Sequence, residues 1–471
     1  MKIKLLLFFL FFLFIIQSIA QTTFYRQYGS GVVQSGIGSS CVQQTFDGGY
    51  ILTGFIYPSG SDAQVYLVKT NAIGDTVWTK IIGGMVGFFM GNFVQQTADS
   101  GYVITGIYQA GEVYLIRTNS MGDTLWTKHY GNSAIGVTGN SVQQTMDGGF
   151  IIVATLSSNS NDVYLIKIDF TGDTLWTKTF GGSNTDYGNS VQQTTDGGYI
   201  IAGETWTNTA GSSDAYLIKT NSNGDTLWTK KYGGTDGEHA NEVRQTNDGG
   251  YVFCGGNGNI YVVKTDANGG IVWQNSYGGI SHDDGFSIKQ TPDNGYVIAG
   301  QIDHYSSAIM NYVADACLLK LRANGTQEWN RNFGPLLGNP SPTYGTYVSL
   351  TADGGYIMTG VNQFAYLIKT DSSGTILTTG ISEYDSENIF SIFPNPANET
   401  LNILFSENSS LNLTGSFNDP LSVQLFNSLG VLLKEFELTK SAQLYIADLS
   451  TGLYFLHLKN YSSKSILFLK Q

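Results

Sequence analysis

Residues 222–234 read SNGDTLWTKKYGG, and this stretch decides the fold because the chain carries several close copies of it. The copies begin at Ala72 (AIGDTVWTKIIGG), Ser120 (SMGDTLWTKHYGN) and Phe170 (FTGDTLWTKTFGG). Internal copies of this kind indicate a structural unit that is repeated along the chain and packed against its neighbours. The fold therefore follows from the number and content of these units.

Three landmarks give the number of units. The first is an Asp-Gly-Gly-Tyr turn or a close variant, at residues 47–50, 99–102, 147–150, 196–199, 248–251, 293–296 and 353–356. The second is a Tyr-Leu-Ile-Lys-Thr segment, and the third is the Trp of Gly-Asp-Thr-Leu-Trp. The Trp positions are Trp78, Trp126, Trp176, Trp228, Trp273 and Trp329, with Thr378 in the last cycle. The chain thus contains seven cycles of roughly 50 residues.

Each cycle predicts four short antiparallel strands. In the fourth cycle these are NSVQQT, GYIIAGET, DAYLIKT and TLWTKKYG, and the two glycines of the first turn allow the positive φ of a tight hairpin. A lone four-stranded sheet cannot bury both faces, which explains why YIIAG and YLIKT are nearly continuous apolar runs. We therefore predict an all-β chain with a seven-bladed β-propeller over residues 21–379, in which the repeated Trp and Tyr pack against the next blade.

The two ends of the repeated region complement each other. Residues 22–29, TTFYRQYG, match TLWTKHYG with Phe24 in the place of the Trp, whereas the last cycle loses its own Tyr-Gly-Gly. We predict that residues 22–28 form the outer strand of the last blade, so that the ring closes without an unpaired seam.

The amino terminus predicts export. Lys2 and Lys4 precede an apolar run at 5–16 and the small residues Ser18 and Ala20, which is the layout of a secretory signal peptide over residues 1–20. The apolar run is shorter than the ~20 residues that a bilayer-spanning helix needs. We expect no transmembrane segment in the mature chain.

The charge balance bears on two classes of partner, nucleic acid and anionic membrane surfaces. The formal net charge is -13, and no cluster of Lys and Arg stands out. Nucleic acid and anionic membrane surfaces are therefore not expected to bind.

After the repeats, residues 380–388 form a polar linker, and residues 389–471 predict a small β-sandwich from short strands separated by turns. Several pieces of this region stand out: Pro394-Asn395-Pro396, the Leu429-Gly430 turn, Gly452-Leu453-Tyr454 and Lys470 near the end. Together they resemble the type A sorting domain of the type IX secretion system. The resemblance implies a Gram-negative exporter, the type IX secretion machinery as a partner, and a secreted or cell-surface location.

Connection lengths separate two faces of the propeller. The Asp-Gly-Gly-Tyr hairpin never changes length, and the third and fourth strands are also joined at constant spacing, as from Tyr66 to Trp78. The other two connections vary: between the second and third strands, the interval runs from 10 residues (Tyr251 to Tyr261) to 21 (Tyr296 to Cys317). Loop variation on a rigid scaffold is typical of a binding face.

The variable connections carry the candidate ligand-binding residues: Trp206, Asp303, His304, Tyr305, Phe88, Phe89, His282, Asp283 and Asp284. Aromatic side chains beside carboxylates suit an extracellular glycan or protein ligand. The alternative is that these side chains only pack their own loops.

The innermost strand offers a second candidate site. One of its positions holds Gln in four cycles and then changes to Arg244, Lys289 and Ser349. One interpretation is hydrogen bonding between blades in a filled channel. The other is that the two cations receive an anionic group.

No catalytic residue, metal site or cofactor is predicted, because the five His lack metal-ligand spacing and no nucleophile or phosphate-binding motif occurs. The three Cys are widely separated, which favours buried apolar roles. The sequence favours an exported binding module for a glycan, polymer or protein. The alternative is an extracellular glycan-active hydrolase or lyase that uses carboxylates such as Asp283 and Asp303.

Overall fold

The computed structural model describes residues 21–28, 38–58, 62–84, 87–108, 111–131, 136–157, 160–207, 209, 212–279, 282–306, 311–333, 343–362, 364–376, 390–393, 399–405, 421–427, 431–438, 441–458 and 465–470. The predicted signal peptide (1–20), the predicted linker (380–388) and the Pro394-Asn395-Pro396 motif lie outside these residues.

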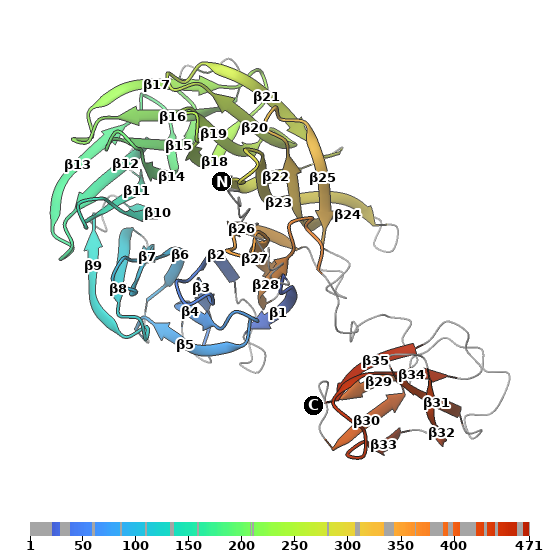
Figure 1. The fold of residues 1–471 in the computed structure, drawn as a ribbon. Helices are drawn as coiled ribbons and strands as arrows, with labels where there is room; N and C mark the ends of the chain where they lie inside the picture. The colour runs from blue at the N-terminus through green and yellow to red at the C-terminus, as the bar shows by residue number, and fades with distance from the viewer. Residues whose placement is uncertain are drawn as a thin grey trace, which may run out of the picture. The chain divides into compact units, whose positions relative to one another are not determined.

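Seven four-stranded antiparallel sheets succeed one another around a central axis (Figure 1). Blade 1 contains β2 (Gly38–Gln44), β3 (Tyr50–Ile56), β4 (Gln64–Thr70) and β5 (Thr76–Ile82), and blade 2 contains β6 (Phe89–Gln96), β7 (Tyr102–Tyr108), β8 (Glu112–Thr118) and β9 (Thr124–Tyr130). Blade 3 contains β10 (Val137–Gln144), β11 (Phe150–Ser157), β12 (Asn161–Ile168) and β13 (Thr174–Phe180), and blade 4 contains β14 (Asp186–Gln193), β15 (Tyr199–Thr205), β16 (Asp214–Thr220) and β17 (Thr226–Tyr232). Blade 5 contains β18 (His239–Gln245), β19 (Tyr251–Gly256), β20 (Ile260–Thr265) and β21 (Ile271–Tyr277), and blade 6 contains β22 (Asp284–Gln290), β23 (Tyr296–Ser306), β24 (Asn311–Leu321) and β25 (Gln327–Asn332). Blade 7 contains β26 (Tyr344–Leu350), β27 (Tyr356–Asn362), β28 (Phe364–Thr370) and β1 (Phe24–Tyr28).

The amino-terminal strand closes the ring, as predicted. Strand β1 pairs antiparallel with β28, and Phe24 stands opposite Lys369 in the register. The Phe24 ring meets the Tyr50 ring of blade 1 edge-on at 5.9 Å between centroids. The Tyr28 hydroxyl donates to the Gly74 carbonyl, also in blade 1, at 2.7 Å. The first and last blades are thus joined by the same kinds of contact that join the others.

One aromatic pair recurs at every junction between blades. The ring on each outer strand packs against the Tyr or Phe at the end of the next blade's first turn, with centroids 5.8 to 6.4 Å apart. The pairs are Phe24–Tyr50, Trp78–Tyr102, Trp126–Phe150, Trp176–Tyr199, Trp228–Tyr251, Trp273–Tyr296 and Trp329–Tyr356. The predicted packing of the repeated Trp against the next blade is confirmed.

A buried cation explains why the first hairpin keeps its length. The basic residue of each third strand is buried and pairs with the Asp of the same blade's turn, which also accepts the backbone N–H of the second glycine, as Asp147 does from Gly149 at 3.0 Å. The ion pairs are Lys69–Asp47, Arg117–Asp99, Lys167–Asp147, Lys219–Asp196, Lys264–Asp248, Lys320–Asp293 and Lys369–Asp353. An inserted residue would move the carboxylate away from a buried charge, which is costly.

The carboxyl-terminal region forms two antiparallel sheets. One contains β29 (Phe390–Phe393), β30 (Thr400–Phe405) and β33 (Ser441–Tyr445), and the other contains β32 (Leu432–Leu438), β31 (Leu421–Asn427), β34 (Gly452–Leu458) and β35 (Ser465–Lys470). Both sheets bury aliphatic side chains, such as Ile403 from the first and Leu425 from the second, as a β-sandwich requires. Gly452 stands opposite Lys470 in the β34–β35 register.

The long connection between the second and third strands of the sixth cycle is largely strand and not loop. Strand β23 runs on to Ser306 and β24 begins at Asn311, so most of the insertion lengthens two strands of blade 6. Tyr305 lies within β23, and its side chain is outside the described part of the structure.

Candidate functional site

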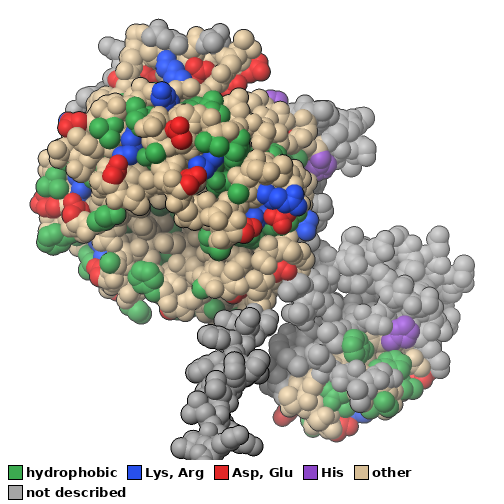
Figure 2. All heavy atoms as spheres, turned by 45° about the horizontal axis from the view of Figure 1, so that its top comes forward, with side chains coloured by type: hydrophobic (Ala, Val, Ile, Leu, Met, Phe, Trp, Pro, Cys, Tyr) green, Lys and Arg blue, Asp and Glu red, His purple; other side chains and the backbone are tan. Residues whose placement is uncertain are grey.

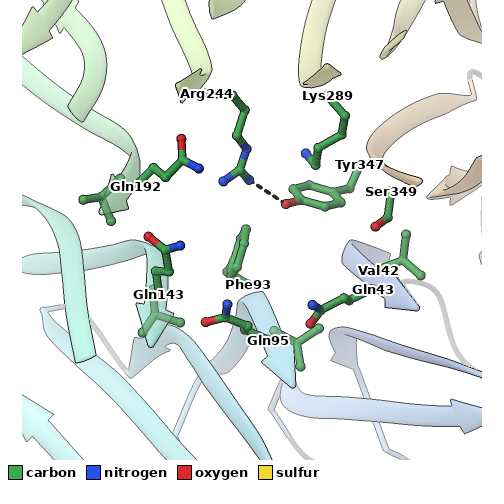
Figure 3. Close-up of a pocket in the computed structure, with 13 residues that line it drawn as sticks. Val42, Gln43, Phe93, Gln95, Gln143, Gln192, Arg244, Lys289, Tyr347 and Ser349 are labelled. Carbon is green, nitrogen blue, oxygen red and sulfur yellow. Dashed lines mark hydrogen bonds between the residues drawn. The ribbon is translucent and has the colours of Figure 1, made fainter. Parts of the chain in front are cut away.

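The innermost strands line a channel pocket of about 290 Å³. Figure 3 shows side chains from all seven blades directed into it. The polar lining consists of Gln43, Gln95, Gln143, Gln192, Arg244, Lys289 and Ser349, and the apolar lining includes Phe93 and the ring of Tyr347. The position that the sequence singled out on each first strand therefore faces the channel.

The four glutamines are held by bonds between blades. Each side-chain Oε1 accepts the backbone N–H of a first-strand residue in the next blade. The backbone N–H groups of Gln96, Gln144, Gln193 and Gln245 donate to the side chains of Gln43 at 2.7 Å, Gln95 at 2.7 Å, Gln143 at 2.5 Å and Gln192 at 2.7 Å, respectively. Only the amide oxygen can accept a hydrogen bond, so these contacts fix which end is the nitrogen. The amide nitrogens point into the pocket (Figure 3).

The two channel cations share an internal anion, Glu242. Its buried carboxylate accepts from Lys289 Nζ at 2.7 Å, from the Ser287 hydroxyl at 2.8 Å, from the Ile288 N–H at 2.6 Å and from Arg244 Nη2. Arg244 Nη2 also donates to the Tyr347 hydroxyl at 3.0 Å. The Glu242 carboxylate therefore partly neutralises the charges of Arg244 and Lys289.

The charges in this cluster shift each other. Burial alone would raise the pKa of Glu242, but Arg244 and Lys289 lower it to about 2. Burial lowers the pKa of Lys289 to about 8, although the Glu242 carboxylate opposes the shift. Burial disfavours any charged form, and an adjacent opposite charge restores it. Glu242 is consequently ionised at neutral pH.

Two aromatic rings lie beneath the polar ring. Phe93 and Tyr347 meet edge-on with centroids 5.5 Å apart, and Lys289 Nζ lies 4.1 Å from the Tyr347 centroid. Each stands two residues before the channel position of its strand, hence on the same side of the strand and farther from the fixed-length turns. The pocket therefore belongs to the fixed end of the channel and not to the variable face.

Sequence reasoning missed Glu242, Phe93 and Tyr347. The signal was available, because the position two residues before the channel Gln is Ser141 and Ser190 in the third and fourth cycles. A period of two places that position on the channel side as well. Large or charged residues there depart from the repeat in the same way as Arg244 and Lys289.

On the variable face, Asp283 closes its own loop. Its buried carboxylate accepts the N–H of Gly279 at 2.6 Å and that of Asp303 at 2.7 Å. The same closure recurs in two earlier blades, where Gly182 donates to Asp186 at 2.8 Å and Gly234 to Glu238 at 3.0 Å. A Gly-Gly pair followed after three residues by a carboxylate is thus a loop-closing element, which the sequence reasoning did not identify.

The other predicted rim residues serve separate local contacts. Asp284 accepts from Asn241 at 3.1 Å and lies 2.9 Å from His239 Nε2. Phe89 is buried against Tyr108, whereas Phe88 is exposed and lies near Tyr57. Three further positions are His282, which is exposed, Trp206, whose Nε1 donates to Glu204 at 2.8 Å, and His304, which pairs with Asp315 at 3.0 Å.

A second pocket, of about 410 Å³, lies between blades 4 and 5 on the variable face. Its lining is Gly233, Gly234, Glu238, Asn257, Tyr261, Gln274, Asn275 and Ser276. The Asn257 amide donates to the Ser276 hydroxyl at 3.1 Å, and the Tyr261 hydroxyl donates to Gln274 at 3.0 Å. Burial raises the pKa of Glu238. We name these eight residues the blade 4–5 groove.

The described residues contain no group of three or more His, Cys, Asp or Glu that would hold a metal ion. The three Cys are buried and form no disulfide bond with one another. Nor does any helix with the length and apolarity of a bilayer crossing occur in the described part of the chain. Figure 2 shows Lys and Arg side chains next to Asp and Glu side chains over the face in view, without a patch of one sign.

The model of the secretion system C-terminal sorting domain matches residues 391–468. None of the curated proteins matches the chain. Among solved structures, the chain is similar to PorZ, an essential surface component of the type-IX secretion system of Porphyromonas gingivalis, at 13% identity and a TM-score of 0.42, over 90% of this chain and 58% of PorZ. The WD40 propeller domain of Doa1 is 12% identical (TM-score 0.46; 74% of this chain, 97% of that one), and YCF48 bound to D1 peptide is 10% identical (TM-score 0.47; 74% and 96%). From the match to residues 391–468, the carboxyl-terminal region of this chain belongs to the secretion system C-terminal sorting domains. The chain is therefore a β-propeller protein that the type IX system delivers to the cell surface or the medium.

Proposed function

We propose that the exported propeller is a binding module that holds a hydroxyl-rich glycan at the blade 4–5 groove on its variable face. The observation that carries this proposal is the lining of the groove. It combines the amides Asn257, Gln274 and Asn275 with a Ser hydroxyl, the Glu238 carboxylate and the Tyr261 ring. Alternating donors and acceptors beside an aromatic ring match the hydroxyl groups and apolar ring faces of a sugar.

The groove arises where blade 5 departs from the repeat. Its second and third strands are joined by a short connection of three residues, 257–259, and Asn257 of this connection lines the groove. Its outer strand reads WQNS, where blade 4 reads WTKK, so Gln274 and Asn275 replace a Thr and a Lys. In blades 1 to 3 that Lys pairs with an Asp in the turn between the third and fourth strands of the following blade, as Lys178 does with Asp225 at 2.9 Å. Blade 5 lacks this Lys, and Gln274 and Asn275 place side-chain amides at these positions instead.

The test restores the repeat. In the variant Gln274→Thr/Asn275→Lys, blade 5 carries the residues of its neighbours, so the blade is expected to fold. The matched control, Thr177→Gln/Lys178→Asn, places the same two amides in blade 3. Both variants and the unmodified exported protein are applied to a glycan array. We expect the unmodified protein and the blade 3 control to bind the same glycans and the blade 5 variant to lose them.

The same experiment addresses catalysis at the rim. The bound glycans are incubated with the protein, and released products are measured by chromatography. Because Asp283 already accepts two backbone N–H groups, we expect no release. Release that disappears in Glu238→Gln would instead support a glycan-active enzyme, and equal binding by the blade 5 variant would reject the groove.

A further inference from the structure

The channel pocket presents hydrogen-bond donors with few free acceptors. The oxygens of its four glutamines are all engaged by backbone N–H groups of the neighbouring blade, which leaves four NH₂ groups directed at the cavity. Arg244 Nε is buried and has no hydrogen-bond partner among the described residues. A buried donor without a partner costs free energy that a ligand acceptor would recover. A ligand here must therefore be rich in oxygen acceptors.

The charge of the cluster indicates a single negative charge on that ligand. Arg244 and Lys289 contribute two positive charges, and Glu242 contributes one negative charge, which leaves one positive charge uncompensated. Glu242 does not line the pocket, and its oxygens are occupied by four donors. Burying a monoanion next to this cluster makes the site neutral, whereas a dianion would leave an excess buried charge.

The donors are spread around a ring and not gathered at one point. Gln43, Gln95, Gln143 and Gln192 come from four successive blades, and Arg244 follows in the fifth. Phe93 and Tyr347 form an apolar floor beneath them. The volume of about 290 Å³ lies at the small end of the range for ligand sites. A small ring bearing oxygens around its edge and one carboxylate satisfies these features.

We propose that the channel pocket binds a hexuronate, a six-carbon sugar acid, whose carboxylate meets Arg244 and whose ring and hydroxyl oxygens accept from the glutamine amides. The ligand is either a free sugar acid or the end residue of an acidic glycan, since both present the same group. The site lies at the fixed end of the channel, so it is separate from the blade 4–5 groove and does not depend on it.

The decisive variant is Gln143→Glu in the full-length protein. A carboxylate keeps the oxygen that accepts the Gln193 N–H but replaces the donor NH₂ by a negatively charged acceptor. Gln144→Glu is the matched control, because the neighbouring Gln144 side chain accepts the Ala98 N–H and does not line the pocket. Thermal unfolding of both variants verifies that the ring remains folded.

Binding is measured by calorimetry with galacturonate and glucuronate, with galactose and glucose as neutral counterparts, and with acetate. We expect both uronates to bind and the other three to bind at least about tenfold more weakly, since a hydrogen bond to a charged group is the strongest contact. Gln143→Glu should lose uronate binding by at least about tenfold through like-charge repulsion, and Gln144→Glu should retain it.

Three results would overturn the proposal: no uronate binding up to about 10 mM, equal binding of the neutral sugars or of acetate, or unchanged binding by Gln143→Glu. A trimer of galacturonate separates the two sources. Binding of the trimer as tight as that of the monomer identifies a glycan end, and binding of the monomer alone identifies a free sugar acid.

Discussion

Each junction between blades depends on one aromatic side chain that the repeat supplies seven times. Trp176 shows its role, because its ring lies edge-on to Tyr199 at 5.9 Å. Replacing a packed Trp by Ala removes dispersion contacts and leaves a cavity. For Trp176→Ala we expect the free energy of unfolding to fall by about 3 kcal/mol. Urea unfolding measures this, and the exposed neighbour Leu175→Ala should change it by less than about 0.5 kcal/mol. Equal effects of the two substitutions would contradict the role of the pair.

The buried carboxylate of Glu242 makes a pH-dependent contribution. Its pKa is about 2 in the folded protein, below the ~4.3 of an unfolded chain, so its stabilising contribution exists above about pH 4.3 and is lost as the pH falls toward 2. Glu242→Gln should lower the free energy of unfolding by about 3 kcal/mol at neutral pH, because two buried cations lose their partner.

That deficit should shrink as the pH is lowered below about 4, since the unmodified protein then loses the same interaction. Denaturant unfolding at several pH values gives the comparison, with Asp236→Asn at an exposed position as the control. A deficit that stays constant down to about pH 3 would show that the Glu242 charge does not stabilise the fold.

Contacts of side chains that recur in every cycle could be predicted from the sequence, whereas contacts of side chains found in a single cycle could not. Trp228 and Tyr251 were predictable partners because every cycle offers the same pair at the same spacing. Glu242 has no counterpart in other cycles, and its partner Lys289 lies in another blade. The packing of blade 5 against blade 6 brings these two strands together at the channel, and the local sequence of neither strand encodes that contact.

Three loops between blades are closed by a carboxylate that accepts a hydrogen bond from a Gly-Gly pair. The first glycine of this element has no room for a side chain: a Cβ on Gly233 would collide with the carboxylates of Asp214 and Glu238, whereas a Cβ on Gly234 meets nothing within 4 Å. Gly233→Ala should therefore lower the free energy of unfolding by about 1 to 3 kcal/mol through overpacking.

Gly234→Ala is its matched control. Neither glycine has a positive φ, so strain of the backbone does not enter the comparison. Thermal unfolding of the two variants should separate them, with Gly234→Ala close to the unmodified protein. If both substitutions were tolerated equally, the carboxylates would not be held where the loop closure requires them.

The elements themselves were largely predictable, because strand and turn signals repeat with the cycle. The constant connections could also be assigned to one face, and buried pairs such as Lys167–Asp147 explain their fixed length. The variable connections were less predictable. The insertion of the sixth cycle continues as β23 and β24, because backbone pairing of two extended segments satisfies more polar groups than a loop would. Asp283, expected as a ligand residue, has backbone partners that only the folded loop supplies.

The propeller is a ring that is complete only if strand β1 completes blade 7. The channel pocket, which all seven blades line, and the Phe24–Tyr50 junction require that closure, because an open arc would expose the pairing edge of β28 and part blade 7 from blade 1. The sequence predicted this closure from the match of residues 22–29 to the repeated outer strand. It also pointed to the channel position of Arg244 and Lys289, but not to Phe93, Tyr347 or the blade 4–5 groove, which depend on how strands of the folded blades come together.

Amide hydrogen exchange of the full-length protein tests the closure most directly. The account predicts that the amides of β1, Phe24–Tyr28, exchange within about tenfold of those in the outer strands β9 and β13, because all three strands pair along one edge. Exchange of β1 that is about a hundredfold faster than that of β9 and β13 would contradict the closed ring.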